Sequence, residues 1–183
     1  SWDSLYFTFE KKFDKKAMSS SGLFLNKNNK NYDRFRDRVI FPIRNTKGKN
    51  IAFGGRVINP DDEPKYLNSP ETKLFNKSNE LYGLYEARRE TKKIDSIIVV
   101  EGYMDVIALH EKGIKNAVAT LGTAVTSNHL SKLMRYASKI FFAFDGDLAG
   151  EKAAWKALEN VLPIIREDTR IKFVFFESGD DPD

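Results

Sequence analysis

Cysteine is absent from the 183 residues of the sequence, and histidine occurs only twice. The lack of cysteine excludes disulfide bonds and cysteine-ligated zinc, so we expect no zinc here, and it is compatible with a reducing cytosol. His110 and His129 have no other ligand at metal-binding spacing, and we expect both to be exposed on helices. No apolar run approaches 18 residues and the N-terminus carries no signal-peptide pattern, so we expect no membrane contact.

What is present suffices for a folded core, since 41% of the residues are hydrophobic and 13% are aromatic. The charge is unevenly distributed. Residues 1–93 contain 20 Lys and Arg against 12 Asp and Glu, whereas residues 94–183 contain 10 against 14. This division favours a polyanionic partner for the first part and cations for the second, although charge also drifts by chance along a chain. The chain starts at Ser1 and stops in an acidic turn, so we expect it to be a piece of a longer protein.

Residues 1–93 predict a small basic α+β subdomain. Apolar runs at 38–43 and 50–58, joined by a turn at 45–49, indicate a β-hairpin. Just before it, Arg34, Arg36 and Arg38 alternate with other residues and would share one face of an extended segment. Such a face can bind phosphates or simply be solvated, and both interpretations stay open.

The segment that follows is irregular and rich in proline, a pattern that is commonly functional inside a compact protein. It spans residues 59–79 and carries Lys65 and Lys77. Beyond it, a helix is predicted from Glu80 to about Thr91, and we place a domain junction near residue 93.

Residues 94–183 alternate between strand and helix patterns, which predicts a βαβ arrangement with a parallel sheet. We expect the aromatic run Phe141–Phe144 and Trp155 to lie in its core. The predicted strands are 96–100, 117–120, 139–144 and 170–176, and the predicted helices are 103–112, 127–136 and 148–165.

Acidic residues follow three of these four strands. Because the carboxyl ends of parallel strands meet at one edge of a sheet, we expect these side chains to converge there. A lone Asp-Gly-Asp motif more often lies on a solvated acidic rim of a sheet. Convergence of three acidic elements instead favours a cation site. Carboxylate oxygens suit Mg²⁺ or Mn²⁺. The residues concerned are Glu101, Asp105, Asp145, Asp147, Asp181 and Asp183.

Two of these motifs resemble the signature of the TOPRIM domain, namely Glu101-Gly102 after one strand and Asp145-Gly146-Asp147 after a later one. Further stretches at 32–36, 66–72 and 181–183 resemble DnaG-type bacterial DNA primases, so the resemblance covers about residue 32 to the end. It implies an α/β fold, with a TOPRIM-type parallel sheet and flanking helices preceded by a smaller basic α+β subdomain. The domains would be residues 1–93 and a TOPRIM domain at 94–183, truncated at its C-terminal end.

The resemblance also implies an activity: synthesis of RNA primers on single-stranded DNA from ribonucleoside triphosphates, at the replication fork in the cytoplasm. By the same resemblance, Glu101, Asp145 and Asp147 would be catalytic and would hold Mg²⁺, with Mn²⁺ as a substitute. Asp105, Asp181 and Asp183 would assist as metal ligands. Nucleotide and template phosphates would be bound by Arg34, Arg36, Arg56, Lys65 and Lys77.

Primases of this family also carry a zinc-binding module and a module that contacts the replicative helicase within the primosome. The sequence contains neither, and it lacks the helical segment that closes the polymerase core, so helicase contact would need a module outside this sequence. Other interpretations stay open: a TOPRIM nuclease or topoisomerase, or a non-catalytic nucleic-acid-binding module. An aspartyl-phosphate phosphatase would need a threonine where Leu148 stands.

Overall fold

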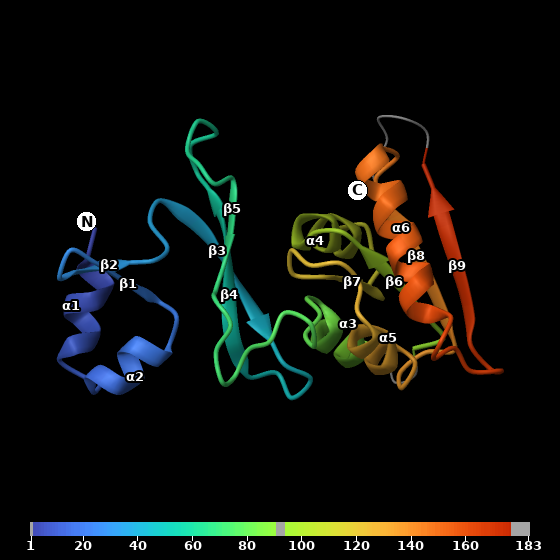
Figure 1. The fold of residues 1–183 in the computed structure, drawn as a ribbon, viewed down its shortest axis with the longest axis horizontal. Coiled ribbons are helices and arrows are strands. Elements are labelled where there is room, and N and C mark those ends of the chain that lie inside the picture. Colours follow the sequence, from blue (N-terminus) through green and yellow to red (C-terminus); the bar gives the residue numbers. More distant parts are fainter. Residues whose placement is uncertain (1, 91–93, 177–183) are drawn as a thin grey trace. The chain divides into compact units, whose positions relative to one another are not determined.

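The structure of the chain, a computed structural model, describes residues 2–90 and 94–176 (Figure 1). The chain divides into two compact units, one made of Ser1–Ile43 and Asn50–Asn76, the other of Arg44–Lys49 and Lys77–Asp183. Residues 77–90 thus belong to the second unit, although they precede the junction predicted near residue 93. Within the described ranges, no helix is long and apolar enough to cross a membrane.

The first unit begins with two short helices and a hairpin, α1 (Ser4–Glu10), α2 (Lys15–Ser20), β1 (Phe24–Lys27) and β2 (Lys30–Asp33), with β1 and β2 antiparallel. Asp33 is buried at the end of β2, where its carboxylate accepts hydrogen bonds from the backbone N–H groups of Leu5 and Tyr6, each at 2.9 Å. This charge-assisted capping of the first turn of α1 holds the helix against the hairpin.

A three-stranded sheet follows, in the order β3 (Arg38–Arg44), β4 (Asn50–Val57) and β5 (Tyr66–Asn68). The hairpin predicted at these positions is confirmed. The extended segment predicted for the three arginines is wrong, because Asp37 has a φ of 49° and turns the chain between β2 and β3.

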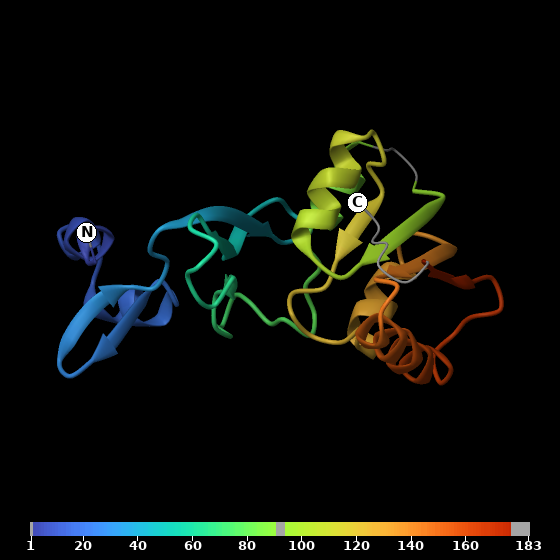
Figure 2. The same ribbon diagram turned by 90° about the horizontal axis from the view of Figure 1, so that it is seen from above.

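The second unit contains a four-stranded parallel sheet, as predicted, and its strands lie in the order β7-β6-β8-β9. Its strands are β6 (Ser96–Val100), β7 (Ala117–Ala119), β8 (Lys139–Phe144) and β9 (Arg170–Phe175). The connecting helices are α4 (Tyr103–Glu111), α5 (Ser127–Leu133) and α6 (Leu148–Val161). Figure 2 shows α4 on one side of this sheet and α5 and α6 on the other.

Alternation of side chains along the strands makes this sheet apolar on both faces. On one face, Ile140 and Phe142 of β8 are buried with residues of α5 and α6, and on the other, Val100 and Ala143 are buried with residues of α4. The core position predicted for Trp155 is wrong, since its side chain is 62% exposed. The buried face of α6 is formed instead by smaller residues, Gly150, Ala154, Ala157 and Val161.

The helix predicted from Glu80 begins later, as α3 (Leu84–Glu90). Tyr82 instead pairs with Ala119 of β7, through backbone hydrogen bonds of 2.9 and 3.0 Å in the two directions. Gly83 then adopts a φ of 81°, which an L-residue rarely adopts and which separates this pairing from the helix. The chain that enters the second unit therefore lies along the β7 edge of the parallel sheet.

Candidate functional site

Glu101 and Asp145 lie together at the carboxyl edge of the parallel sheet. They directly follow β6 and β8, which are neighbours with Val99 opposite Phe142. The carboxylate oxygen Oε1 of Glu101 accepts a hydrogen bond from the backbone N–H of Asp145 at 3.2 Å. Glu101 therefore points towards the acidic turn after β8, as a shared cation site requires.

Asp147 is oriented by the helix that it precedes. Its Oδ1 accepts hydrogen bonds from the backbone N–H groups of Ala149 at 2.9 Å and Gly150 at 2.8 Å, which caps the N-terminus of α6. The turn is tight enough to require glycine at position 150, since a methyl group there would overlap the backbone of Asp145. The sequence Asp-Gly-Asp-Leu-Ala-Gly thus encodes both the cap and the close approach that places Asp145 and Asp147.

Asp105 joins the same edge from α4. Its Oδ2 accepts the backbone N–H of Gly102 at 2.8 Å, so this carboxylate turns back towards the N-terminus of its helix, next to Glu101. Asp181 and Asp183, the other two acidic residues predicted here, lie outside the described residues. The structure therefore brings together four of the six predicted acidic residues, Glu101, Asp105, Asp145 and Asp147.

The surroundings of Glu101 at this edge disfavour its negatively charged form. Burial raises the pKa of Glu101 above its ordinary value, and repulsion from Asp145, Asp147 and Asp105 adds to that effect. The backbone N–H of Asp145 acts in the opposite direction by stabilising the carboxylate. Among residues 2–90 and 94–176, no three acidic or histidine side chains form a ready-made metal cluster. The donors gathered here are all carboxylates, which fit a hard divalent cation.

Two cavities of the second unit open at this acidic edge. The larger, of about 870 Å³, is lined by Asp145 and Asp147 together with Lys152 of α6 and Phe175 of β9. The smaller, of about 320 Å³, is lined by Glu101 and the loop at residues 120–125. Carboxylates thus border spaces large enough for parts of a ligand.

Arg34 and Arg36 gather in the first unit although the backbone turns at Asp37, just before Arg38 of β3. Arg34 donates to the backbone oxygen of Asn68 at 3.3 and 3.2 Å, and partial burial lowers its pKa. Arg36 donates to the backbone oxygen of Asp33 at 2.6 Å and lies 4.7 Å from the ring centre of Trp2. Both line a cavity of about 430 Å³ with Arg38, so the predicted clustering of cationic side chains is present without the predicted strand.

Arg56 and Lys65 lie beside Tyr66, a residue that the sequence alone did not single out as functional. Arg56 and Tyr66 are opposite each other on β4 and β5, and the two cationic groups lie 5.7 and 5.8 Å from the tyrosine ring centre. The ring is exposed. The sequence shows only Lys65 directly before it, because Arg56 is brought beside the ring by the pairing of β4 with β5. Exposed aromatic rings with cations beside them are typical of single-stranded nucleic-acid binding.

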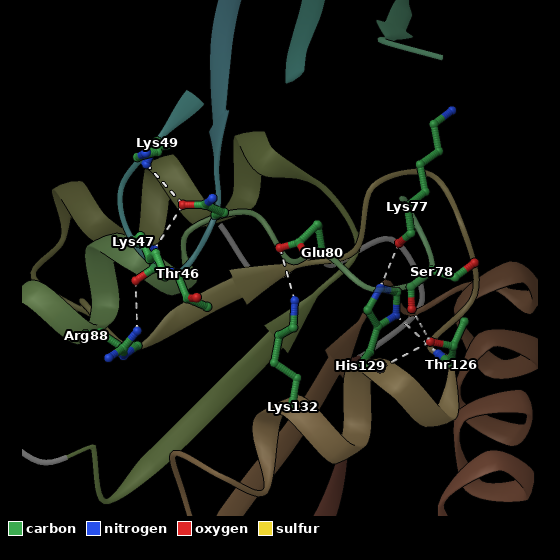
Figure 3. A network of polar contacts seen from close by, with 11 residues as sticks. Thr46, Lys47, Lys49, Lys77, Ser78, Glu80, Arg88, Thr126, His129 and Lys132 are labelled. Carbon is green, nitrogen blue, oxygen red and sulfur yellow. Dashed lines mark hydrogen bonds and ion pairs between the residues drawn. The ribbon is translucent and has the colours of Figure 1, made fainter. Parts of the chain in front are cut away.

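Lys77, the fifth predicted basic residue, belongs to the second unit. Its backbone oxygen lies 2.8 Å from Nε2 of His129, which is fully buried in α5 (Figure 3). The prediction that both histidines are exposed on helices is therefore wrong. His110 is half-buried with Nε2 3.1 Å from the oxygen of Ala117, and both rings are accommodated because their nitrogens find backbone partners.

Comparison with known proteins also divides the chain in two, at a boundary later in the sequence than the one between the compact units, which lies at residues 76 and 77. Residues 1–88 match the family model for the N-terminal domain of the DNA primase catalytic core, and residues 95–175 match the Toprim domain. A DNA primase from Pseudomonas aeruginosa is 59% identical over 170 residues, which covers 92% of this chain and 26% of that protein. The chain thus spans about a quarter of the length of this relative.

Solved structures give the same result. The chain superposes on the E. coli primase catalytic core with a TM-score of 0.95 and 44% identity, covering 100% of this chain and 59% of the other. A structure of the DnaG primase catalytic domain bound to single-stranded DNA gives a TM-score of 0.94 and 45% identity, with 100% and 57% covered. The chain therefore belongs to the DNA primase family, as a part of the catalytic core that contains a Toprim domain.

Proposed function

We propose that this chain is part of the catalytic core of an enzyme that synthesises RNA primers on single-stranded DNA during replication. The observation that carries the proposal is the acidic edge of the Toprim domain, where Glu101, Asp105, Asp145 and Asp147 meet. The match of residues 1–88 to a primase-specific domain supports primer synthesis over DNA cleavage or topoisomerase activity. The proposed reaction is nucleotidyl transfer from ribonucleoside triphosphates, as in a DNA-directed RNA polymerase.

Glu101, Asp145 and Asp147 are the proposed catalytic residues and hold Mg²⁺, with Mn²⁺ as a substitute. Asp105, Asp181 and Asp183 are proposed as additional ligands. When bound, the cation lowers the pKa of the attacking hydroxyl and neutralises charge on the triphosphate. The use of divalent metal by Toprim-type primases in general supports this assignment, as does the mutual repulsion of the four carboxylates, which a cation would relieve.

The chain's own side chains have separate proposed tasks. Arg34, Arg36, Arg56 and Lys65 of the first unit bind template and nucleotide phosphates, and Tyr66 stacks on a base beside Arg56 and Lys65. Lys77 of the second unit binds a phosphate of the nucleotide.

The proposed partners are single-stranded DNA, ribonucleoside triphosphates, the RNA primer and, through a module outside this sequence, the replicative helicase at a cytoplasmic replication fork. The proposed domain division, 1–93 and 94–183, is supported by family matches that stop at 88 and resume at 95.

The proposal is tested by two isosteric substitutions in a complete catalytic core that contains this chain. Glu101→Gln keeps an oxygen that can accept the N–H of Asp145, and Asp147→Asn keeps an oxygen that can cap α6. Both remove a negative charge from the acidic edge, so primer synthesis should fall by at least about 100-fold, as expected for loss of a principal electrostatic contribution.

The measurement is incorporation of labelled ribonucleotides on a single-stranded DNA template, with template affinity measured in parallel by fluorescence anisotropy. Lys139→Ala serves as a control, because this exposed lysine lies at the opposite, amino end of β8. Synthesis should be unaffected in the control, and template affinity should survive in all three variants. Undiminished synthesis by Glu101→Gln and Asp147→Asn would contradict the assignment.

A further inference from the structure

His129 makes hydrogen bonds through both ring nitrogens, and its partners fix which nitrogen carries the proton. Nδ1 lies 3.2 Å from the backbone nitrogen of Thr126 and accepts its N–H. The proton must then be on Nε2, which donates to the backbone oxygen of Lys77 at 2.8 Å. Burial lowers the pKa of the ring, and nearby Lys132 acts in the same direction, so the ring is neutral at physiological pH.

The residues after Lys77 are tied to the same helix by two further contacts (Figure 3). The hydroxyl of Thr126, which caps α5 by accepting the N–H of His129 at 3.2 Å, donates to the backbone oxygen of Ser78 at 2.6 Å. Glu80 and Lys132 form an ion pair of 3.0 Å in which both side chains are largely buried. Three successive contacts therefore hold residues 77–80 on α5.

The contact of His129 is to the backbone of Lys77, not to its side chain. In Figure 3 the lysine side chain points away from the imidazole ring, with its amino group at the far end. The hydrogen bond therefore fixes the backbone position from which the lysine side chain projects. Because the backbone is already fixed, only the lysine side chain has to be ordered on binding, and the total loss of conformational freedom is smaller.

We propose that His129 is a positioning residue that presents Lys77 to a nucleotide phosphate. The proposal rests on the function assigned to Lys77 above. Imidazole suits this place because it accepts one backbone N–H inside the capping box of α5 and donates to a carbonyl 52 residues earlier in the chain. Loss of the second bond leaves the part-buried carbonyl of Lys77 without this donor and loosens the residue at which the chain re-enters the second unit.

Two substitutions separate the tasks of the ring. His129→Asn retains an acceptor near the position of Nδ1 for the cap but cannot reach Lys77, whereas His129→Gln retains a donor near the position of Nε2. The measurement is the Kd of ATP with Mg²⁺ for the 183-residue chain by calorimetry, for wild type, both His129 variants, Lys77→Ala and the double variant His129→Asn/Lys77→Ala.

The expected result is that His129→Asn and Lys77→Ala each weaken ATP binding by about tenfold, a typical cost of losing one contact to a charged group. The double variant should bind no more weakly than Lys77→Ala alone, and His129→Gln should recover most of the affinity. Wild-type affinity in His129→Asn, or losses that multiply in the double variant, would overturn the positioning role while leaving the function of Lys77 standing. If Lys77→Ala binds ATP like the wild type, the function assigned to Lys77 fails, and the positioning role fails with it.

A second measurement needs no His129 variant and therefore does not depend on its folding. In ¹⁵N-histidine-labelled protein, the two ring nitrogens of His129 should show the neutral tautomer with the proton on Nε2. Saturation with ATP and Mg²⁺ should shift the Nε2 resonance in the wild type and leave it unshifted in Lys77→Ala. An unshifted resonance in the wild type, or equal shifts in both proteins, would contradict the proposal.

Discussion

At the scale of single residues, Glu101 is the carboxylate of the acidic edge whose negative charge is destabilised by burial and by its acidic neighbours. Its carboxylate is partly buried and lies among Asp105, Asp145 and Asp147, and its pKa is raised for these reasons. Because the folded-state pKa lies above the ordinary 4.5, the folded protein takes up this proton before the unfolded chain does as pH falls. The ionised side chain thus lowers the stability of the metal-free protein at neutral pH.

Glu101→Gln should therefore raise the thermal unfolding midpoint of the metal-free protein at pH 7, by a few degrees at most, since partial exposure screens the repulsion. As pH falls from the raised pKa of Glu101 towards 4.5, the wild type should gain stability relative to the variant. The difference between their unfolding midpoints should become smallest near pH 4.5. Calorimetric melting curves at several pH values measure both effects. If the variant were less stable than the wild type at pH 7, the negative charge of Glu101 would not be destabilising in the folded protein, which would contradict this prediction.

At the scale of secondary-structure elements, the start of α6 determines where Asp145 and Asp147 lie. Gly150 is in the first turn of that helix, against the backbone of Asp145, and an added methyl group has no space there. Gly150→Ala should destabilise the protein by about 1–3 kcal/mol, the usual cost of overpacking, and should weaken Mn²⁺ binding by displacing the acidic turn.

Chemical denaturation and calorimetric Mn²⁺ titration test this together, with Gly102→Ala as the matched control. Gly102 has an extended backbone, and a methyl group there would meet Asp105 at an ordinary contact distance of 3.4 Å. The control should lose about 0.5–1 kcal/mol, because alanine is less favourable than glycine at an N-cap, and its Mn²⁺ binding should be unchanged. Equal effects of the two substitutions would mean that the tight turn is not what places the carboxylates.

The same scale separates what sequence patterns can predict from what they cannot. The strands and helices of the second unit were predictable because buried parallel strands are continuous apolar runs, and the carboxylates followed from strand ends meeting at one edge. The burial of His129 was not predictable, because its hydrogen-bond partner is a backbone oxygen, a group that every residue carries. Likewise the pairing of Tyr82 with Ala119 and the bend at Asp37 depend on backbone geometry that composition does not encode. Trp155 was misplaced because small residues beside it form the buried face of α6.

At the scale of the whole molecule, the uneven charge of the sequence has a separate consequence for the first unit. Its cationic side chains Arg34, Arg36, Arg56 and Lys65 are proposed to contact phosphates, and each contact releases a counterion. Four such contacts predict that log Kobs for single-stranded DNA falls with log salt with a slope of about −3. Arg36→Ala should make the slope shallower by about 0.7, and Lys139→Ala should leave it unchanged. Anisotropy titrations between low and physiological salt measure the slopes, and a slope near zero in the wild type would exclude a cationic template surface.

The central claim concerns the acidic edge, where a parallel sheet gathers carboxylates from distant parts of the sequence into a cation site. Crystals of the protein soaked in Mn²⁺ test it directly by anomalous diffraction. The account predicts a manganese peak in contact with Glu101 and Asp145, and its loss in crystals of Glu101→Gln. A fully ordered acidic edge without any anomalous peak, or with manganese bound only elsewhere, would contradict it.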